Sequence, residues 1–351
     1  MRARHLSALR IHVIVLILAV TGSCVTNQYS NSKAGTNREE PDSFTLAVLP
    51  DTQNYLPTAS NGGRLDYVKV FESQTRWILQ NHLRENIVFV LHEGDITSEN
   101  SDLEWGLVNE IFSPLDGIVP YILTPGNHDV PSHAQSPGNP RDTANYNKTF
   151  PVDRFQHEPW WGGHMEADPD QRFVLFTAGG TDFMVVTLEW MPNDEMLAWA
   201  NEVVEAHPDR RVIVLTHSYL DSDETRIGPE DNRASHQASL WTDDTNNGED
   251  IWEEFVRRHK NIFLVLCGHV LSCGRLTSRG DHGNKVHQVL ANYQGMENGG
   301  NGWLRLMRFE PAADRIVVSA YSPWLDRYSH DESDGFVLEL SDAREIESQV
   351  H

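Results

Sequence analysis

The sequence predicts an α/β protein in which β-sheets are covered by helices. In the first half of the chain, apolar runs of strand length alternate with segments whose apolar residues recur at helical spacing. After Gly268, four short apolar segments follow one another and are separated by Gly, Asn and Asp. We expect these segments, residues 275–277, 286–292, 304–309 and 316–321, to form a second, antiparallel sheet.

The elements of the first half are read from their apolar patterns. The strand candidates span residues 44–49, 87–91, 119–124, 212–216 and 262–266. The helix candidates span residues 65–84, the segment that Ser101 and Asp102 cap, 194–207 and 249–259. The chain contains no internal repeat, so we expect one folded domain over residues 43–345.

Residues of metal-binding type lie just past the carboxyl end of each of these five strands. They are Asp51 and Gln53, Gly94-Asp95, Gly126-Asn127-His128-Asp129, His217, and Gly268-His269. Open sheets with crossover helices place their sites at this edge. We therefore expect these side chains to meet in one site.

This ordered set resembles the calcineurin-like metallophosphoesterase superfamily, whose motifs read D-x-H, GD, GNH-[ED], H and GH-x-H. The resemblance covers roughly residues 44–310. It implies a four-layer αββα sandwich, with two facing mixed β-sheets flanked by helices. It also implies a metal-dependent phosphoric ester hydrolase with two divalent metal ions (Mn, Fe, Zn or Co).

The resemblance also implies a role for each matching residue. The metal ligands would be Asp51, Gln53, Asp95, Asn127, His217 and His269. Asp95 would bridge the ions, with Asn127 and the two histidines completing one site and Asp51 and Gln53 beginning the other. His128 would stabilise the phosphoryl oxygens or protonate the leaving oxygen. A metal-bound hydroxide would attack phosphorus in line, in a phosphomonoester or a phosphodiester.

Two positions depart from the family pattern. Gln53 stands where the family usually has His, and it offers only a neutral amide oxygen. Leu271 stands at the second histidine of GH-x-H and cannot bind a metal. We expect the site of Asp51 and Gln53 to be weak, or to take a hard ion such as Mn or Mg. His282 or His287 could swing in as a replacement, but histidines in a hairpin are usually surface residues.

Two branches of the superfamily do not match. The segment after Asp95 lacks the second Asp and the Arg of the protein phosphatase motif GD-x-x-D-R-G. Ser98 occupies the position of the tyrosine in the purple acid branch, so no iron–tyrosinate is expected. An alternative from another class is a degenerate metal-binding module that captures a phosphorylated envelope ligand without turnover; Gln53 and Leu271 motivate it.

The N-terminal residues have the pattern of an export signal. Three arginines precede an apolar stretch, residues 11–20, that is too short to span a bilayer. Residues 21–24 then resemble a bacterial lipoprotein cleavage box. We expect a signal peptide over residues 1–23, a lipid on Cys24 and a disordered tether over residues 24–42. The protein would be a membrane-anchored envelope lipoprotein, with plain secretion as the alternative.

Charge and loops complete the prediction. The formal net charge of −23 disfavours nucleic acid as a partner, whereas bound cations still permit a small phosphorylated substrate. Cys267 is expected to be a small buried thiol. The long segments 131–171 and 220–247 follow proposed ligands and are expected to be loops over the site, with surface insertion or partner docking as alternatives. The Trp160-Trp161 pair would stack on substrate or pack its loop onto the body.

Overall fold

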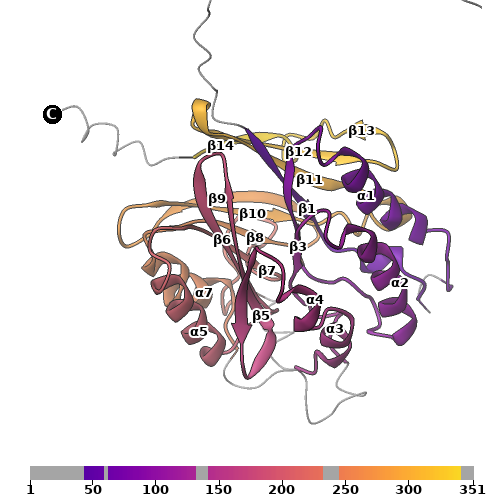
Figure 1. Ribbon diagram of the computed structural model, residues 1–351, viewed down its shortest axis with the longest axis horizontal. Coiled ribbons are helices and arrows are strands. Elements are labelled where there is room, and N and C mark those ends of the chain that lie inside the picture. The colour runs from indigo at the N-terminus through magenta and orange to yellow at the C-terminus, as the bar shows by residue number, and fades with distance from the viewer. Residues whose placement is uncertain (1–42, 59–61, 132–140, 232–244, 341–351) are drawn as a thin grey trace, which may run out of the picture. The chain divides into compact units, whose positions relative to one another are not determined.

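Two mixed β-sheets of seven strands each form the framework of the protein (Figure 1). The computed structural model describes residues 43–58, 62–131, 141–231 and 245–340. The expected signal peptide, Cys24 and the tether over residues 24–42 lie outside these ranges. Within them, no helix combines the length and the apolar character needed to cross a bilayer.

The first sheet has the strand order β13-β12-β11-β1-β2-β3, and β14 pairs with β12. Its strands are β1 (Phe44–Leu49), β2 (Ile87–His92), β3 (Tyr121–Leu123), β11 (Leu304–Glu310), β12 (Arg315–Ser322), β13 (Arg327–Tyr328) and β14 (Phe336–Glu339). Strands β1, β2 and β3 run parallel, and β11 pairs antiparallel with β1. The carboxyl ends of β1, β2 and β3 therefore share one edge of this sheet.

The second sheet has the strand order β4-β5-β6-β7-β8-β10-β9. Its strands are β4 (Trp161–Met165), β5 (Asp168–Ala178), β6 (Thr181–Leu188), β7 (Arg211–Thr216), β8 (Ile262–Cys267), β9 (Cys273–Arg279) and β10 (Lys285–Ala291). Strands β6, β7, β8 and β10 are parallel, whereas β5 and β9 pair antiparallel with their neighbours. The sheet is therefore parallel in its middle and antiparallel at both edges.

The four segments after Gly268 do not form a sheet of their own, so that part of the prediction was wrong. β9 and β10 extend the second sheet, where β10 pairs parallel with β8. β11 and β12 extend the first sheet, where β11 pairs with β1 from the start of the domain. The segments were identified as strands correctly, but their partners are distant in sequence and leave no local signal.

Helices cover the outer faces of both sheets (Figure 1). Within the described ranges, the α-helices are α1 (Val68–Asn81), α2 (Asp102–Phe112), α3 (Ala144–Thr149), α4 (Val152–Phe155), α5 (Asp194–Glu205) and α7 (Gly248–Glu254). Short 3-10 helices span Gln53–Tyr55, Ser113–Leu115, Val256–Arg258, Glu297–Gly299 and Pro311–Ala313. The predicted cap of α2 is present: Ser101 accepts from Glu104 N, and the Glu104 carboxylate accepts from Ser101 N.

Alternating side chains of the second sheet divide the core into two layers. On β6, Phe183 and Val185 belong to the cluster that also holds the residues of the first sheet, α1 and α2. Met184 and Val186 belong to the cluster that holds the residues of α5 and α7. Because side chains of a strand point alternately to its two faces, one sheet contributes to both layers. The four-layer arrangement of two facing sheets flanked by helices is confirmed, and Cys267 is a buried free thiol, as predicted.

The segment 131–171 contains more regular structure than its sequence predicts. It was expected to be a long loop, yet its described part forms α3, α4, β4 and the start of β5. Trp160 is buried against Phe89 and Phe155, so the indole packs the segment onto the body. Residues 132–140 of this segment and residues 232–244 of the second predicted loop lie outside the described ranges.

The aromatic contact between the two sheets generates a stability prediction. Phe183 on β6 lies 5.5 Å from Phe44 and 5.8 Å from Phe309 of the facing sheet, between ring centroids, and is buried. We expect Phe183→Ala to lower the free energy of unfolding by about 3–5 kcal/mol in urea titrations, because it opens a cavity between rigid sheets. The control Leu83→Ala, at an 85% exposed residue, should change it by less than about 0.5 kcal/mol. Equal losses in the two variants would contradict this packing.

Candidate metal centre

The loops that follow parallel strands of the two sheets meet at one place. Asp95 follows β2 of the first sheet, and His217 follows β7 of the second. Their side chains are both buried, with 3.2 Å between Asp95 Oδ1 and His217 Nε2. The site therefore lies at the carboxyl edges of both sheets at once, whereas the sequence indicated only that each residue follows a strand.

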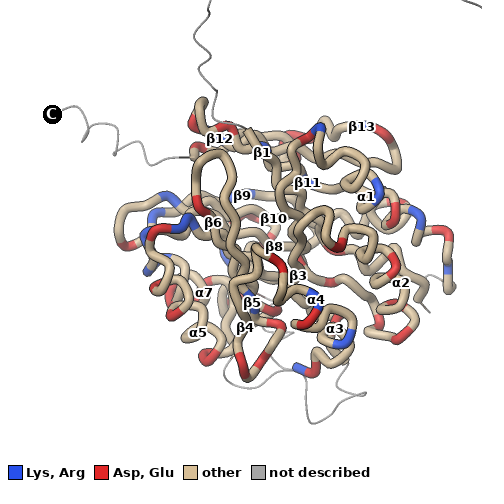
Figure 2. The backbone as a smooth tube through the Cα atoms, in the orientation of Figure 1, with Lys and Arg blue, Asp and Glu red and all other residues tan. Residues whose placement is uncertain are grey.

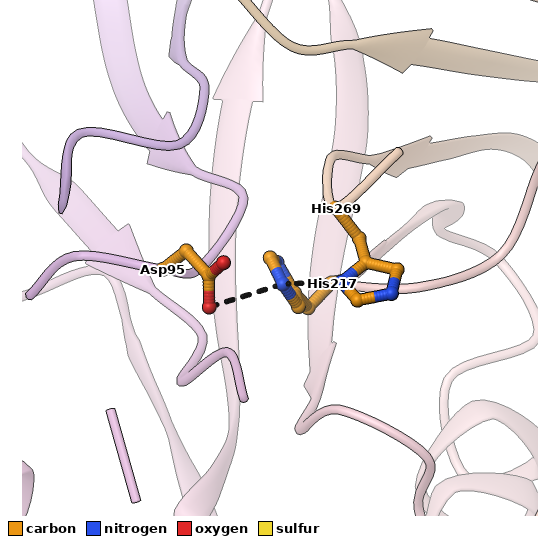
Figure 3. A group of neighbouring side chains, drawn as sticks. All are labelled: Asp95, His217 and His269. Atoms are coloured by element: carbon orange, nitrogen blue, oxygen red, sulfur yellow. Dashed lines mark hydrogen bonds and ion pairs between the residues drawn. The ribbon is translucent and has the colours of Figure 1, made fainter. Parts of the chain in front are cut away.

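His217 Nε2 is the centre of a group of four possible metal-ligating atoms. It lies 3.1 Å from Asn127 Oδ1 and 3.2 Å from His269 Nδ1, in addition to its contact with Asp95. Figure 3 shows the side chains of Asp95, His217 and His269 directed toward one another. Ligands about 2.1 Å from one ion lie roughly 3.0–3.4 Å apart in octahedral or tetrahedral geometry. The observed separations fit one divalent cation.

A backbone carbonyl fixes the orientation of the His217 ring. Nδ1 of His217 lies 2.8 Å from the carbonyl oxygen of Glu93, which can only accept, so Nδ1 carries a proton. Nε2 then faces the other ligand candidates. Burial alone would lower the pKa of His217, but the charge and hydrogen bond of Asp95 outweigh burial and raise it to about 9. A proton on Nε2 thus takes the place that a cation would fill.

Asp95 is held as a carboxylate by its neighbours. Burial would raise its pKa, but the charges of His217 and His128 outweigh this effect and keep the pKa below its usual range. The backbone N–H of His128 donates to Asp95 Oδ1 at 2.9 Å. The backbone of Asp95 has φ of 50°, a left-handed conformation that few residues other than Gly adopt. Such strain is common where a loop must aim a functional side chain.

Gln53 contacts the second carboxylate oxygen of Asp95, and Asp51 contacts the loop of His269. The two oxygens of Asp51 accept from the His269 backbone N–H at 3.1 and 3.2 Å. Gln53 Nε2 donates to Asp95 Oδ2 at 2.8 Å, while Gln53 Oε1 is buried without a hydrogen-bond partner in the described part of the chain. Rotation of the amide would present Oε1 to a cation shared with Asp95. The orphaned oxygen and the two carboxylates fit a second cation with oxygen ligands.

Glycine is required in two of the motifs because ligands pass close to the backbone. A Cβ on Gly126 would overlap the backbone N and Oδ1 of Asp95. A Cβ on Gly268 would overlap Oδ2 of Asp51. In both motifs the glycine of one loop admits the carboxylate of another loop.

Asp129 binds two of the loops to each other, a role that its sequence motif did not reveal. Its carboxylate accepts from the backbone N–H groups of Gly126, Ile96 and Thr97 at 2.8–3.0 Å. The Thr97 hydroxyl donates to it as well, at 2.9 Å. Asp129 is fully buried, and burial followed by the charge of Asp95 raises its pKa to about 6. It therefore fixes the loop of Asn127 relative to the loop of Asp95.

His92 makes a similar connection at the end of β2. The Thr52 hydroxyl donates to Ile96 O at 3.2 Å, so it accepts from His92 Nε2 at 2.9 Å. His92 Nδ1 accepts from Gly94 N at 3.2 Å. These partners require a neutral ring protonated on Nε2, and burial together with the charge of His217 lowers the pKa of His92 to about 3. A proton on His92 Nδ1 would point at the backbone N–H of Gly94, so two hydrogen-bond donors would face each other. This would break the hydrogen bond and loosen the Asp95 loop.

His128 differs from the other candidates because its side chain is exposed. Its Nδ1 lies 2.8 Å from the carbonyl oxygen of Ser98 and so donates to it. The charge of Asp95, assisted by this hydrogen bond, raises the pKa of His128. The ring is therefore anchored through Nδ1 with Nε2 on its far side, an arrangement suited to contact with a ligand.

No histidine takes the position that Leu271 leaves open in the part of the chain that the structure describes. The Leu271 side chain is 60% exposed. His287 lies on β10, where its ring nitrogens bond Thr277 and the carbonyl of Glu339. His282 bonds the carbonyl of Arg258. Both rings are hydrogen-bonded to other groups, and His282 is exposed, as expected for a histidine in a hairpin.

Comparison with known proteins identifies relatives of this fold and of this sequence. Residues 44–273 match the family model described as calcineurin-like phosphoesterase. The uncharacterized protein YvnB of Bacillus subtilis (strain 168) is 32% identical over 303 residues. The match includes 84% of this chain but 21% of YvnB, so this chain spans about a fifth of that relative.

Two solved structures are similar in fold. A dimetal phosphatase from Danio rerio has a TM-score of 0.54 and 13% identity, over 85% of this chain and 99% of the phosphatase. A purple acid phosphatase from yellow lupin seeds has a TM-score of 0.53 and 14% identity, over 87% of this chain and 55% of that one. At these identities the likeness is evidence for the fold alone.

The neutral state of His92 generates a pH prediction. A histidine in the unfolded chain has a pKa near 6.5. Below that pH the unfolded chain therefore binds a proton at His92, whereas folded His92 stays neutral until the pH approaches 3. Stability from this group is present above pH 6.5 and falls by up to about 1.4 kcal/mol per pH unit as the pH approaches 3. In urea titrations of metal-free protein at pH 7, 6 and 5, the parent should lose stability more steeply than His92→Gln. If the difference in unfolding free energy between the parent and His92→Gln were the same at all three pH values, folded His92 would not be a neutral group.

Proposed function

This chain belongs to the calcineurin-like phosphoesterase family, and on that premise we propose that it hydrolyses phosphate esters of small molecules at a centre of two divalent cations. The observation that carries the proposal is the convergence of Asp95, Asn127 and His269 on His217 Nε2, at separations of 3.1–3.2 Å. Four buried or half-buried ligand atoms from both sheets at that spacing suit one divalent cation.

The two halves of the centre offer different ligands. His217, His269, Asn127 and Asp95 would hold one cation with mixed nitrogen and oxygen donors. Asp51, Gln53 and Asp95 would hold the other with oxygen alone, which suits a hard ion such as Mn or Mg. Leu271 removes an imidazole from that second half. We therefore expect the second cation to bind more weakly than the first.

When bound, such cations neutralise charge on phosphoryl oxygens and lower the pKa of water. Asp95 and its neighbouring ligand candidates would hold the cations, and the backbone N–H of His128 fixes the Asp95 carboxylate by donating to Oδ1. His128 itself, with a raised pKa and an exposed ring, would donate from Nε2 to the leaving oxygen of the ester. Its hydrogen bond to Ser98 O keeps the ring in that orientation.

A second candidate function is capture of a phosphorylated ligand without turnover. The exposed Leu271 and the neutral Gln53 favour it, because both weaken the second cation site. Such a module would bind one cation or none and would not need the proton that His128 supplies. Metal content and turnover therefore separate the two candidates.

The first test compares turnover with metal content. Metal-free protein should hydrolyse neither p-nitrophenyl phosphate nor bis(p-nitrophenyl) phosphate, and Mn²⁺ should restore hydrolysis of at least one of them. His217→Ala removes the central ligand and should lower kcat/KM at least about 100-fold. His282→Ala, at an exposed histidine outside the centre, is the matched control and should keep full activity. Two bound cations per chain without turnover on either ester would contradict the proposed activity, and one or none without turnover would favour the capture module.

The second test addresses His128. His128→Ala should lower kcat by about 10²–10⁴-fold on phenyl phosphate, as expected for loss of a general acid. The loss should be much smaller on p-nitrophenyl phosphate, whose leaving group needs no proton, and the bound Mn²⁺ should stay the same. Equal losses on both esters would overturn proton donation to the leaving oxygen.

A further inference from the structure

A second group of acidic side chains lies at the start of β5 and the end of β6. The register of β5 and β6 runs to Phe173 opposite Val186, and Glu189 follows directly after the end of β6. Asp168 lies two residues before Asp170 and so shares its face of the strand. Figure 2 shows acidic residues at the turn between β4 and β5. The fold thus brings three carboxyl groups together beyond the last paired residues of β5 and β6.

These carboxyl groups are close and poorly solvated. One oxygen from each of Asp168, Asp170 and Glu189 lies within 4.8 Å of the others. Asp170 is fully buried, and neither of its carboxylate oxygens has an N–H or hydroxyl hydrogen-bond partner in the described ranges. Glu189 is 2% exposed, and its Oε2 lacks such a partner as well. Buried carboxylates without partners are costly unless an opposite charge is present.

Arg141 supplies positive charge to this group. It pairs with Glu189 Oε1 and donates to the carbonyl of Met191 at 2.7 Å. Burial, with the repulsion among the acids, raises the pKa of Asp168 to about 10 and that of Glu189 to about 8. Hydrogen bonds with Asp170 contribute to both shifts, so these acids share protons with Asp170 unless a cation neutralises the group.

We propose that Asp168, Asp170 and Glu189 form a third cation site, separate from the two-metal centre, which binds Ca²⁺. The site offers carboxylate oxygen only, the donor set of hard cations. Ligands of Ca²⁺ at 2.3–2.6 Å lie up to roughly 5 Å apart across the ion, which accommodates the spread of these oxygens. The cation would supply the positive charge that the buried Asp170 lacks.

The site would position one wall of the two-metal centre. Glu189 is followed by Trp190, whose ring centroid lies 6.3 Å from that of His269. The Trp190 backbone N–H donates to Pro125 O at 3.2 Å, directly before the Gly126 motif. A cation that joins the start of β5 to Glu189 would therefore fix the segment on which Trp190 stands. This role does not depend on which ester the protein hydrolyses.

The test uses Tb³⁺, a luminescent substitute for Ca²⁺ that nearby tryptophans such as Trp190 sensitise. All variants carry Asp95→Asn in the full-length, metal-free protein, so that binding at the two-metal centre is weakened. We expect sensitised Tb³⁺ emission that decreases when added Ca²⁺ displaces the bound Tb³⁺. In Asp170→Asn the affinity for Tb³⁺ should fall at least tenfold. The matched control Asp182→Asn changes an exposed acid at the far end of β6 and should bind Tb³⁺ like its parent. Equal Tb³⁺ binding in Asp170→Asn, or no emission in the parent, would overturn the site.

Thermal unfolding distinguishes the site from three acids that share protons. If Ca²⁺ binds there, it should raise the Tm of the Asp95→Asn parent and of Asp182→Asn, but not that of Asp170→Asn. If the acids only share protons, Ca²⁺ should leave every Tm unchanged and Asp170→Asn should melt above its parent. Glu189→Gln provides a second variant with the same expectations, and it decides the question if Asp170→Asn fails to fold.

Discussion

The contact between Asp95 and His217 is the constraint on which the rest of the site depends. Each residue ends a strand of a different sheet, and their side chains meet in a buried place at 3.2 Å. Burial penalises both charges, yet each holds the other in its charged form. The carbonyl of Glu93 and the backbone N–H of His128 fix the orientation of the pair. Because the two sheets face each other, residues at the strand ends of both sheets can form a single centre.

The sequence predicted the parts of the fold that local patterns encode. Local patterns predicted the apolar strand segments, the Ser101 cap of α2 and the candidate metal ligands that follow each strand. The family motifs then gave each candidate ligand its expected role. Strand partners do not follow from local pattern, which is why β9 to β12 were assigned to a separate sheet. β4 escaped notice because Gly162 and Gly163 interrupt its pattern, although their absent side chains admit the ring of Phe173.

The residues that support the centre were harder to predict than the candidate ligands. Asp129 accepts from backbone N–H groups of another loop, and His92 donates to the Thr52 hydroxyl of another loop. No spacing in the sequence indicates either contact. The group of Asp170 and Glu189 arises because β5 and β6 form an antiparallel hairpin, which brings the start of one strand near the end of the other. A prediction of two strands joined by a turn at Gly179-Gly180 would have placed those two acids at the same end of the hairpin. The sequence thus indicates which residues can bind metal, whereas the packing of the chain determines which other residues fix the positions of these ligands.

The central claim is that one cation binds between the two sheets at His217 Nε2. A crystal structure of the Mn²⁺-loaded protein, with anomalous scattering measured for manganese, tests it most directly. We expect a strong peak within bonding distance of His217 Nε2, Asp95, Asn127 and His269, and a weaker peak beside Asp51. A well-ordered structure in which Mn²⁺ is absent from that position would contradict the account.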